Sequence, residues 1–560
     1  MQIIECVPNF SEGRNMAIID QITDEIKKVK GVRLLDVDPG FDTNRTVVTM
    51  VGEPEPVKLA AFNAIKKAQD LIDMTKHKGA HPRFGACDVC PVIPVSGITM
   101  DECVVIAHDL GKKLGEELDY PVYFYEYAAT APERKNLAWV RQGEYEALES
   151  NMKQADRKPD AGPLEFRPKK GATAVSARDF LIAYNVSLNT TNAKLAHDIA
   201  LNIREQGRFL KDENDKFVKD ENGKKVKQPG IFKNCKAIGW YVDDYKRAQI
   251  SINLTNYHVT SMHDVFDEIC KQAAEKGLRV TGSEAVGVVP KEAMLIAGKH
   301  YLAKQGMCEG IDEGEIIKVA IQSLGLDDVA PFDPKDKIIE YMIAKEGKLA
   351  DLTITQFNDL LSTDAPAPGG GSVAALAGSI AASLGAMVMN LTYDKKGYKK
   401  FNEETNRLAK ELQDRKYELI NLIDADTDAF NVLMDALQAK SKAKKSDDEN
   451  EKAAAEKQYY DATVLATDVP LKVMNRIIEL TPFIKRVAEF GNTNAASDAG
   501  VAALMIEAGV KGAGLNVKIN LSGFDDADEY KISTLKKMND ILAEVNGKVE
   551  EILAIVDSKI

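Results

Sequence analysis

Short runs of apolar residues alternate with longer amphipathic stretches over the first 126 residues of the chain. The short runs have the composition of buried strands, and the longer stretches repeat an apolar residue every three or four positions, as helices do. This pattern predicts the order βαββαβ followed by one more helix and strand, at residues 3–7, 16–29, 32–37, 46–51, 56–72, 89–95, 101–118 and 122–125. The order is that of a split βαβ, ferredoxin-like layer.

The same order returns after a polar segment at 151–170. We expect strands at 181–187, 237–242, 248–254 and 279–284, and helices at 192–205, 262–276 and 290–304. Two tandem domains of one pattern predict a pseudo-symmetric pair with a cleft between them, and such clefts commonly hold ligands. The charged stretch 207–229, centred on Asn222-Gly223, is typical of a solvated hairpin, to which we assign no chemistry.

Beyond Ala344 the periodicity is helical, and only 515–521 has the pattern of a strand. The predicted architecture is two tandem α+β ferredoxin-like (split βαβ) subdomains at 1–180 and 181–342, a linker at 343–353 and an all-α helical bundle at 354–560. The uncharged stretch 365–393 has a short apolar part rich in Ala, Gly and Ser. This composition favours a close-packed helix of a soluble protein over a membrane span.

The composition narrows the classes of ligand and compartment. With 73 Lys and Arg against 86 Asp and Glu, the net charge is -13, which argues against binding to nucleic acid or to an anionic membrane. Local basic clusters must therefore hold any anionic ligand. The seven cysteines are few for 560 residues, and the first residues carry no basic and apolar leader, so we expect a reducing, cytoplasmic location without a secretory signal.

The first candidate site lies between a predicted helix and a strand, at residues 76–91. His77, His81, Cys87 and Cys90 resemble a zinc ligand set, but alternation along the strand should turn the two cysteines apart, which disfavours both a metal site and CxxC redox chemistry. Pro82 holds His81 extended, and a neutral imidazole there can act as a general base. The alternative for His81 is a loop histidine that binds its own backbone.

Two further groups are expected at the same edge of the first sheet. Asp38 closes one strand and Arg45 opens the next, so a carboxylate and a guanidinium should lie close together, although turn chemistry alone could explain both. Arg83 follows His81 by two positions and can grip a carboxylate through two hydrogen bonds.

In the helical part, a glycine-rich stretch opens a long helix at about Val373. Free backbone N–H groups at such a helix start can bind an anion, and the candidate residues are Gly369, Gly370, Gly371 and Ser372. No Gly-Lys-Ser/Thr follows, so the stretch is not a P-loop. Gly371, Gly378 and Gly385 recur every seven residues, which keeps one helix face bare for close packing.

An aspartate interrupts an apolar helical stripe further along the chain. The stripe contains Leu419, Ile423, Phe430, Leu433 and Leu437, and Asp426 falls on it. A carboxyl group at a core position is costly unless it has a partner or a function. The aspartates at 424, 426 and 428 imitate the start of a calcium-binding loop, but Ala429 replaces the required glycine and the stripe continues, so we reject calcium.

With these motifs in order, the chain resembles the formimidoyltransferase-cyclodeaminases, the bifunctional folate enzymes of histidine degradation. The resemblance covers nearly the whole length and rests on Glu5-Cys-Val-Pro-Asn-Phe-Ser-Glu-Gly13, Leu34-Leu-Asp-Val-Asp38, Thr43-Asn-Arg-Thr46, His81-Pro-Arg-Phe-Gly85, Asp88-Val-Cys-Pro91, Glu144-Tyr-Glu-Ala147, Gly239-Trp-Tyr241, Ala367-Pro-Gly-Gly-Gly-Ser372, Asp424-Ala-Asp426 and Gly491-Asn492.

For the first two domains, the resemblance implies transfer of a formimino group from N-formimino-L-glutamate to N5 of tetrahydrofolate. It makes His81 the catalytic histidine and Asp38 an acid near it, while Arg45 and Arg83 are our own candidates for the substrate carboxylates. It also implies a folate-binding segment made of Gly162, Pro163, Leu164, Glu165, Phe166, Arg167, Pro168, Lys169, Lys170 and Gly171. Arg167, Lys169 and Lys170 suit a polyglutamate tail. A polar interdomain linker is the alternative for this segment.

For the helical domain, the resemblance implies closure of 5-formiminotetrahydrofolate to 5,10-methenyltetrahydrofolate with release of ammonia, and Asp426 as the active-site acid. It also implies a homo-oligomer that uses polyglutamylated folate and no metal. Lys395, Lys396, Lys399 and Lys400 could tether the folate tail, although a solvated surface explains them more simply. Two alternatives stay open: a formyl-transferring or cyclohydrolase-type folate enzyme, and an inactive folate-binding scaffold.

Overall fold

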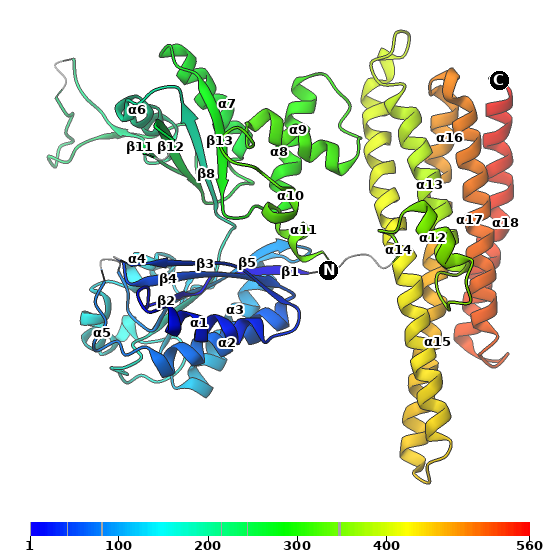
Figure 1. Cartoon of the computed structure of the whole chain (residues 1–560), viewed down its shortest axis with the longest axis horizontal. Coiled ribbons are helices and arrows are strands. Elements are labelled where there is room, and N and C mark those ends of the chain that lie inside the picture. The colour runs from blue at the N-terminus through cyan, green and yellow to red at the C-terminus, as the bar shows by residue number, and fades with distance from the viewer. Residues whose placement is uncertain (1, 42, 80–81, 214–215, 244, 345–348) are drawn as a thin grey trace. The chain divides into compact units, whose positions relative to one another are not determined.

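The computed structural model describes residues 2–41, 43–79, 82–213, 216–243, 245–344 and 349–560. The chain forms two compact units (Figure 1): Met1–Ala297 with Ala320–Ala344 form the first, and Gly298–Val319 with Lys345–Ile560 form the second. The first unit has mixed α/β structure, and the second is almost entirely helical.

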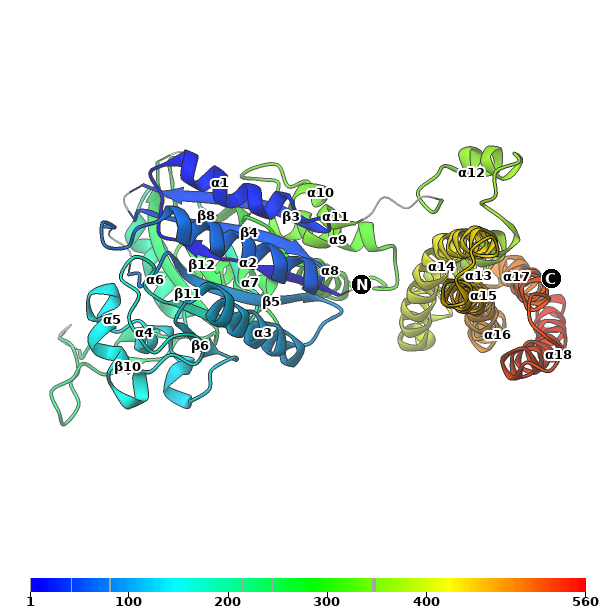
Figure 2. The same cartoon turned by 90° about the horizontal axis from the view of Figure 1, so that it is seen from below.

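The first sheet of the α/β unit has seven strands: β1 (Ile3–Cys6), β2 (Asn9–Phe10), β3 (Val32–Gly40), β4 (Arg45–Gly52), β5 (Cys87–Ser96), β6 (Val122–Glu126) and β7 (Thr173–Ala177). β3 pairs with β4, and β1 and β2 lie between β4 and β5, all antiparallel. Helices α1 (Met16–Lys27), α2 (Pro54–Leu71) and α3 (Met100–Leu118) cover one face (Figures 1 and 2).

The pattern of apolar residues did not predict β7, which pairs in parallel with both β5 and β6. Its sequence, Thr-Ala-Val-Ser-Ala, has small side chains, and all five residues are buried. Short elements cover part of the opposite face of the sheet: η1 (Pro132–Lys135), α4 (Leu137–Val140), α5 (Glu144–Met152) and η2 (Ala155–Arg157). This opposite face carries the polar side chains of the first candidate site.

The second sheet has the order β11 (Cys235–Val242), β12 (Arg247–Leu254), β8 (Ile182–Leu188) and β13 (Val280–Val286), with every pair antiparallel. Helices α6 (Ala193–Ile203) and α7 (Met262–Glu275) pack on one face. The predicted hairpin is confirmed for the described residues, because β9 (Arg208–Phe209) pairs with β10 (Lys227–Gln228) at its base. Helices α8 (Lys291–Lys304), α9 (Glu313–Leu324), α10 (Pro334–Lys337) and α11 (Ile339–Ile343) follow.

The helical unit contains α12 (Ile354–Leu361), α13 (Gly370–Asn390), α14 (Asn402–Ala443), η3 (Lys399–Phe401), α15 (Glu449–Ile478), α16 (Thr481–Phe490), η4 (Thr493–Ala495), α17 (Ala496–Leu521) and α18 (Glu529–Asp557). α13 packs against α14 and α17. A Cβ added at Gly378 would overlap the Ile477 side chain, so the glycine stripe does allow close helix contact. Among the described helices, only α13 is long and apolar enough to cross a membrane, and 61% of its most apolar window is buried within the unit.

The strand expected at 515–521 is wrong, because these residues form the last turns of α17. Their alternating apolar and polar residues fit a period of two, but the helix turns them onto two faces. Val517 and Leu521 are buried, whereas Leu515 and Ile519 are 70% and 68% exposed. Positions four residues apart share a helix face, so the sequence of 515–521 fits the pattern of a strand as well as that of a helix.

Candidate active sites

A bulge at the start of β5 builds the first site. The pairing of β2 with β5 shifts register between Asn9 and Phe10, so that Asn9 lies opposite Val89 and Phe10 opposite Cys87. Bulges change the direction of a side chain, and here the extra residue is Asp88. Asp88 is fully buried. Its Oδ1 accepts a hydrogen bond from the backbone N–H of Phe84 at 3.1 Å.

Two arginines share the other oxygen of the Asp88 carboxylate. Arg141 donates from Nη1 to Asp88 Oδ2 at 2.6 Å, and Arg45 donates from its own Nη1 to the same oxygen. Arg45 also donates from Nη2 and Nε to Asn9 Oδ1, at 2.8 and 3.1 Å. Burial lowers the pKa of Arg45, and the positive charge of Arg141 adds to this, while Asp88 opposes it. The sequence analysis did not predict that Asp88, Asn9 and Arg141 belong to this site, because they come from separate segments of the chain.

Arg83 has a different environment from the one we expected. Its guanidinium donates to Glu146 Oε1 at 2.7 Å and to Glu144 Oε2 at 3.1 Å, and the hydrogen bond to Glu146 is the main reason that its pKa is raised. These two carboxylates occupy the donors that we assigned to substrate. The geometry therefore favours Arg141 over Arg83 as a partner of Arg45 for a substrate carboxylate.

His77 anchors one end of the segment that carries His81. Its Nε2 lies 2.8 Å from the backbone oxygen of Asn44, and its Nδ1 lies 3.3 Å from Arg83 Nε. A carbonyl on one side and an N–H donor on the other fit the neutral tautomer with the proton on Nε2. Burial is the main cause of its lowered pKa, and the charge of Arg83 contributes. His81 itself lies outside the described residues.

Asp38 and Arg45 lie at the same end of the β3–β4 pair, as the order of the strands indicates. Asp38 is opposite Val47 and Gly40 is opposite Arg45 in the register. Asp38 is exposed, whereas Arg45 pairs with Asp88 rather than with Asp38. A role for Asp38 beside His81 stays a prediction.

The expected folate-binding segment, 162–171, leads into β7 and contacts the residues just before β5. The backbone N–H of Ala86 donates to the Lys170 oxygen at 2.9 Å, and Tyr145 donates to the Pro168 oxygen at 2.6 Å. Arg167 is held by Asp119 at 2.6 Å, and Lys170 Nζ donates to the Leu118 oxygen. Of its three basic side chains, Lys169 is the most exposed, so it is the best placed to meet a carboxylate in solvent.

The sequence argument against a metal at Cys87 and Cys90 assumed that alternation along the strand turns the two thiols apart. This assumption is wrong. The bulge at Asp88 turns both thiols into the same hydrophobic core, where Cys90 lies 3.5 Å from Cys6, sulfur to sulfur. Burial raises the pKa of Cys87 well above its ordinary value. Within the described part of the chain, no group of three or more His, Cys, Asp or Glu could hold a metal ion.

Glu5 is a further buried acid on the first sheet that we did not single out. It is 5% exposed, and burial raises its pKa to about 7, opposed by the charge of Arg178. A single acid in an apolar strand gives no signal of its environment, because the residues that bury it come from other strands.

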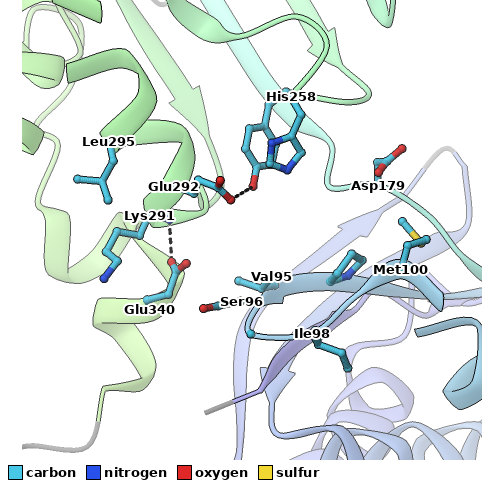
Figure 3. A pocket seen from close by; sticks show the side chains of 13 residues that line it. Val95, Ser96, Ile98, Met100, Asp179, His258, Lys291, Glu292, Leu295 and Glu340 are labelled. Carbon is cyan, nitrogen blue, oxygen red and sulfur yellow. Dashed lines mark hydrogen bonds between the residues drawn. The ribbon is translucent and has the colours of Figure 1, made fainter. Parts of the chain in front are cut away.

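Two of the cavities in the α/β unit differ in the charge of the residues that line them. One has a volume of 480 Å³, and Figure 3 shows Val95, Ser96 and Ile98 on one side of it and His258 and Glu292 on the other. Three carboxylates line it, from Asp179, Glu292 and Glu340, against the single ammonium of Lys291. This balance does not suit an anionic substrate.

The second cavity has a volume of 670 Å³ and the opposite balance of charge. Lys135, Arg178 and Lys236 line it together with Glu126 and Asp179. Tyr125, Tyr127 and Leu137 add aromatic and apolar surface. Such a lining can accept a ligand that combines an aromatic ring with a carboxylate.

The second candidate site lies where the start of α13 meets α14. Asp426 is partly buried, and its Oδ2 accepts a hydrogen bond from Ser372 Oγ at 3.3 Å. A Cβ added at Gly371 would overlap both oxygens of the Asp426 carboxylate, so only glycine allows this approach. Burial raises the pKa of Asp426, and hydrogen bonds from the side chain and backbone of Ser372 partly offset the rise. The helix start that we expected to bind an anion therefore lies against a carboxyl group of the protein itself, that of Asp426.

The environment of Asp426 suits proton transfer. A sheltered carboxyl group with a raised pKa holds its proton closer to neutral pH, which suits a general acid. Asp424 has a structural role instead, because its Oδ1 accepts a hydrogen bond from the backbone N–H of Leu349 at 2.8 Å.

Comparisons with known families cover both units. The family model described as "Formiminotransferase domain, N-terminal subdomain" matches residues 3–178, "Formiminotransferase domain" matches 183–344, and "Formiminotransferase-cyclodeaminase" matches 353–540. The formimidoyltransferase-cyclodeaminase of Mus musculus is 41% identical over 561 residues, which cover 100% of this chain and 99% of the relative.

Shorter relatives match one unit each. The glutamate formimidoyltransferase of Streptococcus pyogenes is 40% identical over 301 residues, 54% of this chain and 93% of the relative. The methenyltetrahydrofolate cyclohydrolase of Methylorubrum extorquens is 38% identical over 208 residues, 37% of this chain and 97% of the relative.

These matches, together with the two sites, define a class of two-site enzyme in which an α/β transferase is joined to a helical cyclodeaminase. The chain belongs to the formimidoyltransferase-cyclodeaminase family, as the full-length identity establishes.

Proposed function

We propose that this chain catalyses two successive reactions on one folate carrier. In the first, a formimino group passes from N-formimino-L-glutamate to N5 of tetrahydrofolate. In the second, 5-formiminotetrahydrofolate closes to 5,10-methenyltetrahydrofolate and ammonia leaves. The full-length match to relatives that join both activities in one chain carries this proposal.

In the transferase, N5 attacks the formimino carbon, and His81 takes the N5 proton. The tetrahedral intermediate then breaks its bond to the glutamate nitrogen, which leaves as an amine after the protonated His81 gives it the proton taken from N5. Asp38 orients this histidine or stabilises its protonated, positively charged form. His77 and Arg83 hold the described end of the same segment, through the hydrogen bond between Arg83 Nε and His77 Nδ1.

In the cyclodeaminase, N10 attacks the same carbon and loses its proton, and Asp426 protonates the nitrogen that departs as ammonia. Burial raises the pKa of Asp426, so the group keeps this proton to a higher pH than an exposed aspartate would. The start of α13, with Gly371 and Ser372, holds the carboxyl group in place.

Several finer statements belong to the same proposal. The second sheet, with its order β11-β12-β8-β13, is a ferredoxin-like split βαβ layer, and the first is an extended version of it. The enzyme acts in histidine degradation in the cytoplasm as a homo-oligomer, without a metal. It uses polyglutamylated folate, with Lys169 and the lysines at 395–400 near the tail.

The test supplies purified full-length protein with both substrates and follows methenyltetrahydrofolate absorbance and ammonia. We expect His81→Ala to abolish transfer while it leaves the cyclisation of supplied 5-formiminotetrahydrofolate intact, and Asp426→Asn to do the reverse. General acid or base loss should cost about 10²–10⁴-fold in the affected step. If both folded variants lost both steps, the assignment of two sites would be wrong. Activity with formyl-glutamate alone would favour the formyl transferase instead.

A further inference from the structure

We propose that Arg141 and Arg45, held together on Asp88, bind a carboxylate of the amino-acid donor in the transferase. This inference rests on the proposed function and deepens it by naming a subsite. It replaces Arg83 with Arg141 in the pair that we expected from the sequence.

Among the described residues, the two guanidinium groups of this cluster share one carboxylate. Asp88 is fully buried, and the side chains of Arg45 and Arg141 are only 12% and 15% exposed. Water screens such groups poorly, so Arg141 would interact strongly with a further anion at its outer edge. A substrate carboxylate would be such an anion.

The geometry of Arg141 leaves a suitable edge for that anion. Both of its hydrogen bonds to described residues leave from Nη1, one to Asp88 Oδ2 at 2.6 Å and one to the Pro82 oxygen at 3.3 Å. The Nε and Nη2 donors form the other edge of the planar group, and two parallel N–H donors match the two oxygens of a carboxylate. In Arg83 the corresponding edge is already occupied, because Nε donates to His77 Nδ1 at 3.3 Å and Nη2 donates to Glu146 Oε1 at 2.7 Å.

The position of the pair also fits the transferase. Pro82, whose oxygen Arg141 contacts, directly follows His81 in the chain. Arg141 ends helix α4, and its backbone N–H bonds to Leu137, which lines the 670 Å³ cavity. Tyr125 lines the same cavity and packs in one hydrophobic cluster with Val89 and Val140, which directly follow Asp88 and precede Arg141 in the chain, so the two features are close. The more acidic cavity of Figure 3 offers no such partner for a glutamate.

The experiment measures both Michaelis constants of full-length Arg141→Gln and Arg141→Lys. We expect Arg141→Gln to raise KM for N-formimino-L-glutamate about 10–100-fold, as loss of a bidentate charged contact would, with a smaller change in kcat and in KM for tetrahydrofolate. Arg141→Lys keeps the charge without the planar fork, so it should recover only part of the affinity. Lys153→Gln is the matched control, because it removes one exposed positive charge from the same segment.

A donor with one carboxylate fewer sharpens the test. Wild-type enzyme should prefer N-formimino-glutamate to N-formimino-4-aminobutyrate, which lacks the α-carboxylate, and to N-formimino-glutamine, which lacks the side-chain carboxylate. Arg141→Gln should lose its preference against the analogue that lacks the bound carboxylate. The kcat for formimino transfer at saturating donor reports that the α/β unit of each variant is folded. If Arg141→Gln does not fold, the lysine variant carries the same comparison.

The outcomes are distinct. An unchanged KM for the donor, or a rise confined to tetrahydrofolate, would overturn the carboxylate subsite while the proposed function stands. Absence of formimino transfer by the wild-type protein would instead remove the proposed function itself.

Discussion

Asp426 lies on the apolar stripe of α14, and the start of α13 supplies the polar partners that make this position tolerable. Burial favours the protonated acid, whereas the N–H and hydroxyl groups of Ser372 favour the carboxylate. The balance between these opposing effects sets the pH at which the group gives up its proton. One hydroxyl group therefore influences the pH range of the second reaction.

Ser372→Ala should move the alkaline limb of the cyclisation pH profile to higher pH. Without the Ser372 hydroxyl, less opposes burial, so the pKa of Asp426 rises further above its ordinary value. A group that acts in its protonated form then stays active to higher pH. The measurement is kcat/KM for supplied 5-formiminotetrahydrofolate against pH.

Ser379→Ala provides the control for that shift. Ser379 is on the same helix, and its hydroxyl donates to the Leu376 oxygen at 2.8 Å rather than to a carboxylate. A limb that moves to lower pH in Ser372→Ala, or moves equally in both variants, would contradict the role given to Asp426.

The sequence predicted some of these residues and missed others for physical reasons. Asp426 was visible because an acid on a helical stripe breaks a local pattern of period 3.6. The partners of Arg83 were not visible, because Glu144 and Glu146 are about 60 residues away and only the fold brings them together. Asp88 was hidden by a bulge, since one extra residue reverses which side chains face the core.

At the scale of the element, the start of α13 determines the second site. The helix begins at Gly370 without a side-chain cap, and Gly371 lies directly against the Asp426 carboxylate. Glycine is disfavoured within helices by about 1 kcal/mol, so its presence here needs a steric reason. The closeness of α14 supplies that reason.

Gly371→Ala should lower cyclisation by about 10²-fold or more while it leaves formimino transfer unchanged, because the added methyl group displaces the general acid. Both rates are measured on the same preparation. Gly547→Ala is the control: a Cβ there meets no atom within 4 Å, so the variant should keep both activities and gain about 0.5–1 kcal/mol of helix stability. Full cyclisation activity in Gly371→Ala would show that the carboxyl group is not held by this contact.

Most of the longer elements were predictable, although helices such as α5 and α9 were not predicted. The causes are clearest for β7 and for the end of α17. The amphipathic helices and alternating strands of residues 1–126 each carry a strong local period. β7 carries none, because a central strand of small buried residues has neither alternation nor bulk. The last turns of α17 carry a period of two by coincidence, and only the helix before them decides the structure.

At the scale of the whole molecule, the units are not simply consecutive in sequence. Residues 298–319 pack with the helices of the second unit, although the chain then returns to the first. Within the second unit, Asn390 donates to the Gly310 oxygen at 2.9 Å, and Tyr417 donates to Asp312 Oδ2 at 2.7 Å. Sequence patterns indicated a boundary near 342 because composition changes there, but composition carries no information about which body a helix packs on. The boundaries at 180, 342 and 353 stay predictions.

Cleavage of the chain between Ala344 and Leu349, at an inserted protease site, should leave the two fragments associated. Residues 298–319 stay covalently attached to the front fragment and packed on α14, so the fragments should elute together in size-exclusion chromatography at micromolar concentration. Gly310→Val should weaken this association, because a Cβ there overlaps Ala409. Separation of the unsubstituted fragments after cleavage would contradict the packing of 298–319.

The apolar character of α13 has a consequence for synthesis of the protein. α13 leaves the ribosome about 100 residues before α17, which covers a large part of its surface. At about 5–20 residues per second, this delay lasts roughly 5–20 s. During this interval a nascent helix with the length and hydropathy of a membrane span lacks some of the helices that bury its apolar surface. Slower growth or extra chaperone should therefore raise the yield of soluble enzyme more than any change at the two active sites.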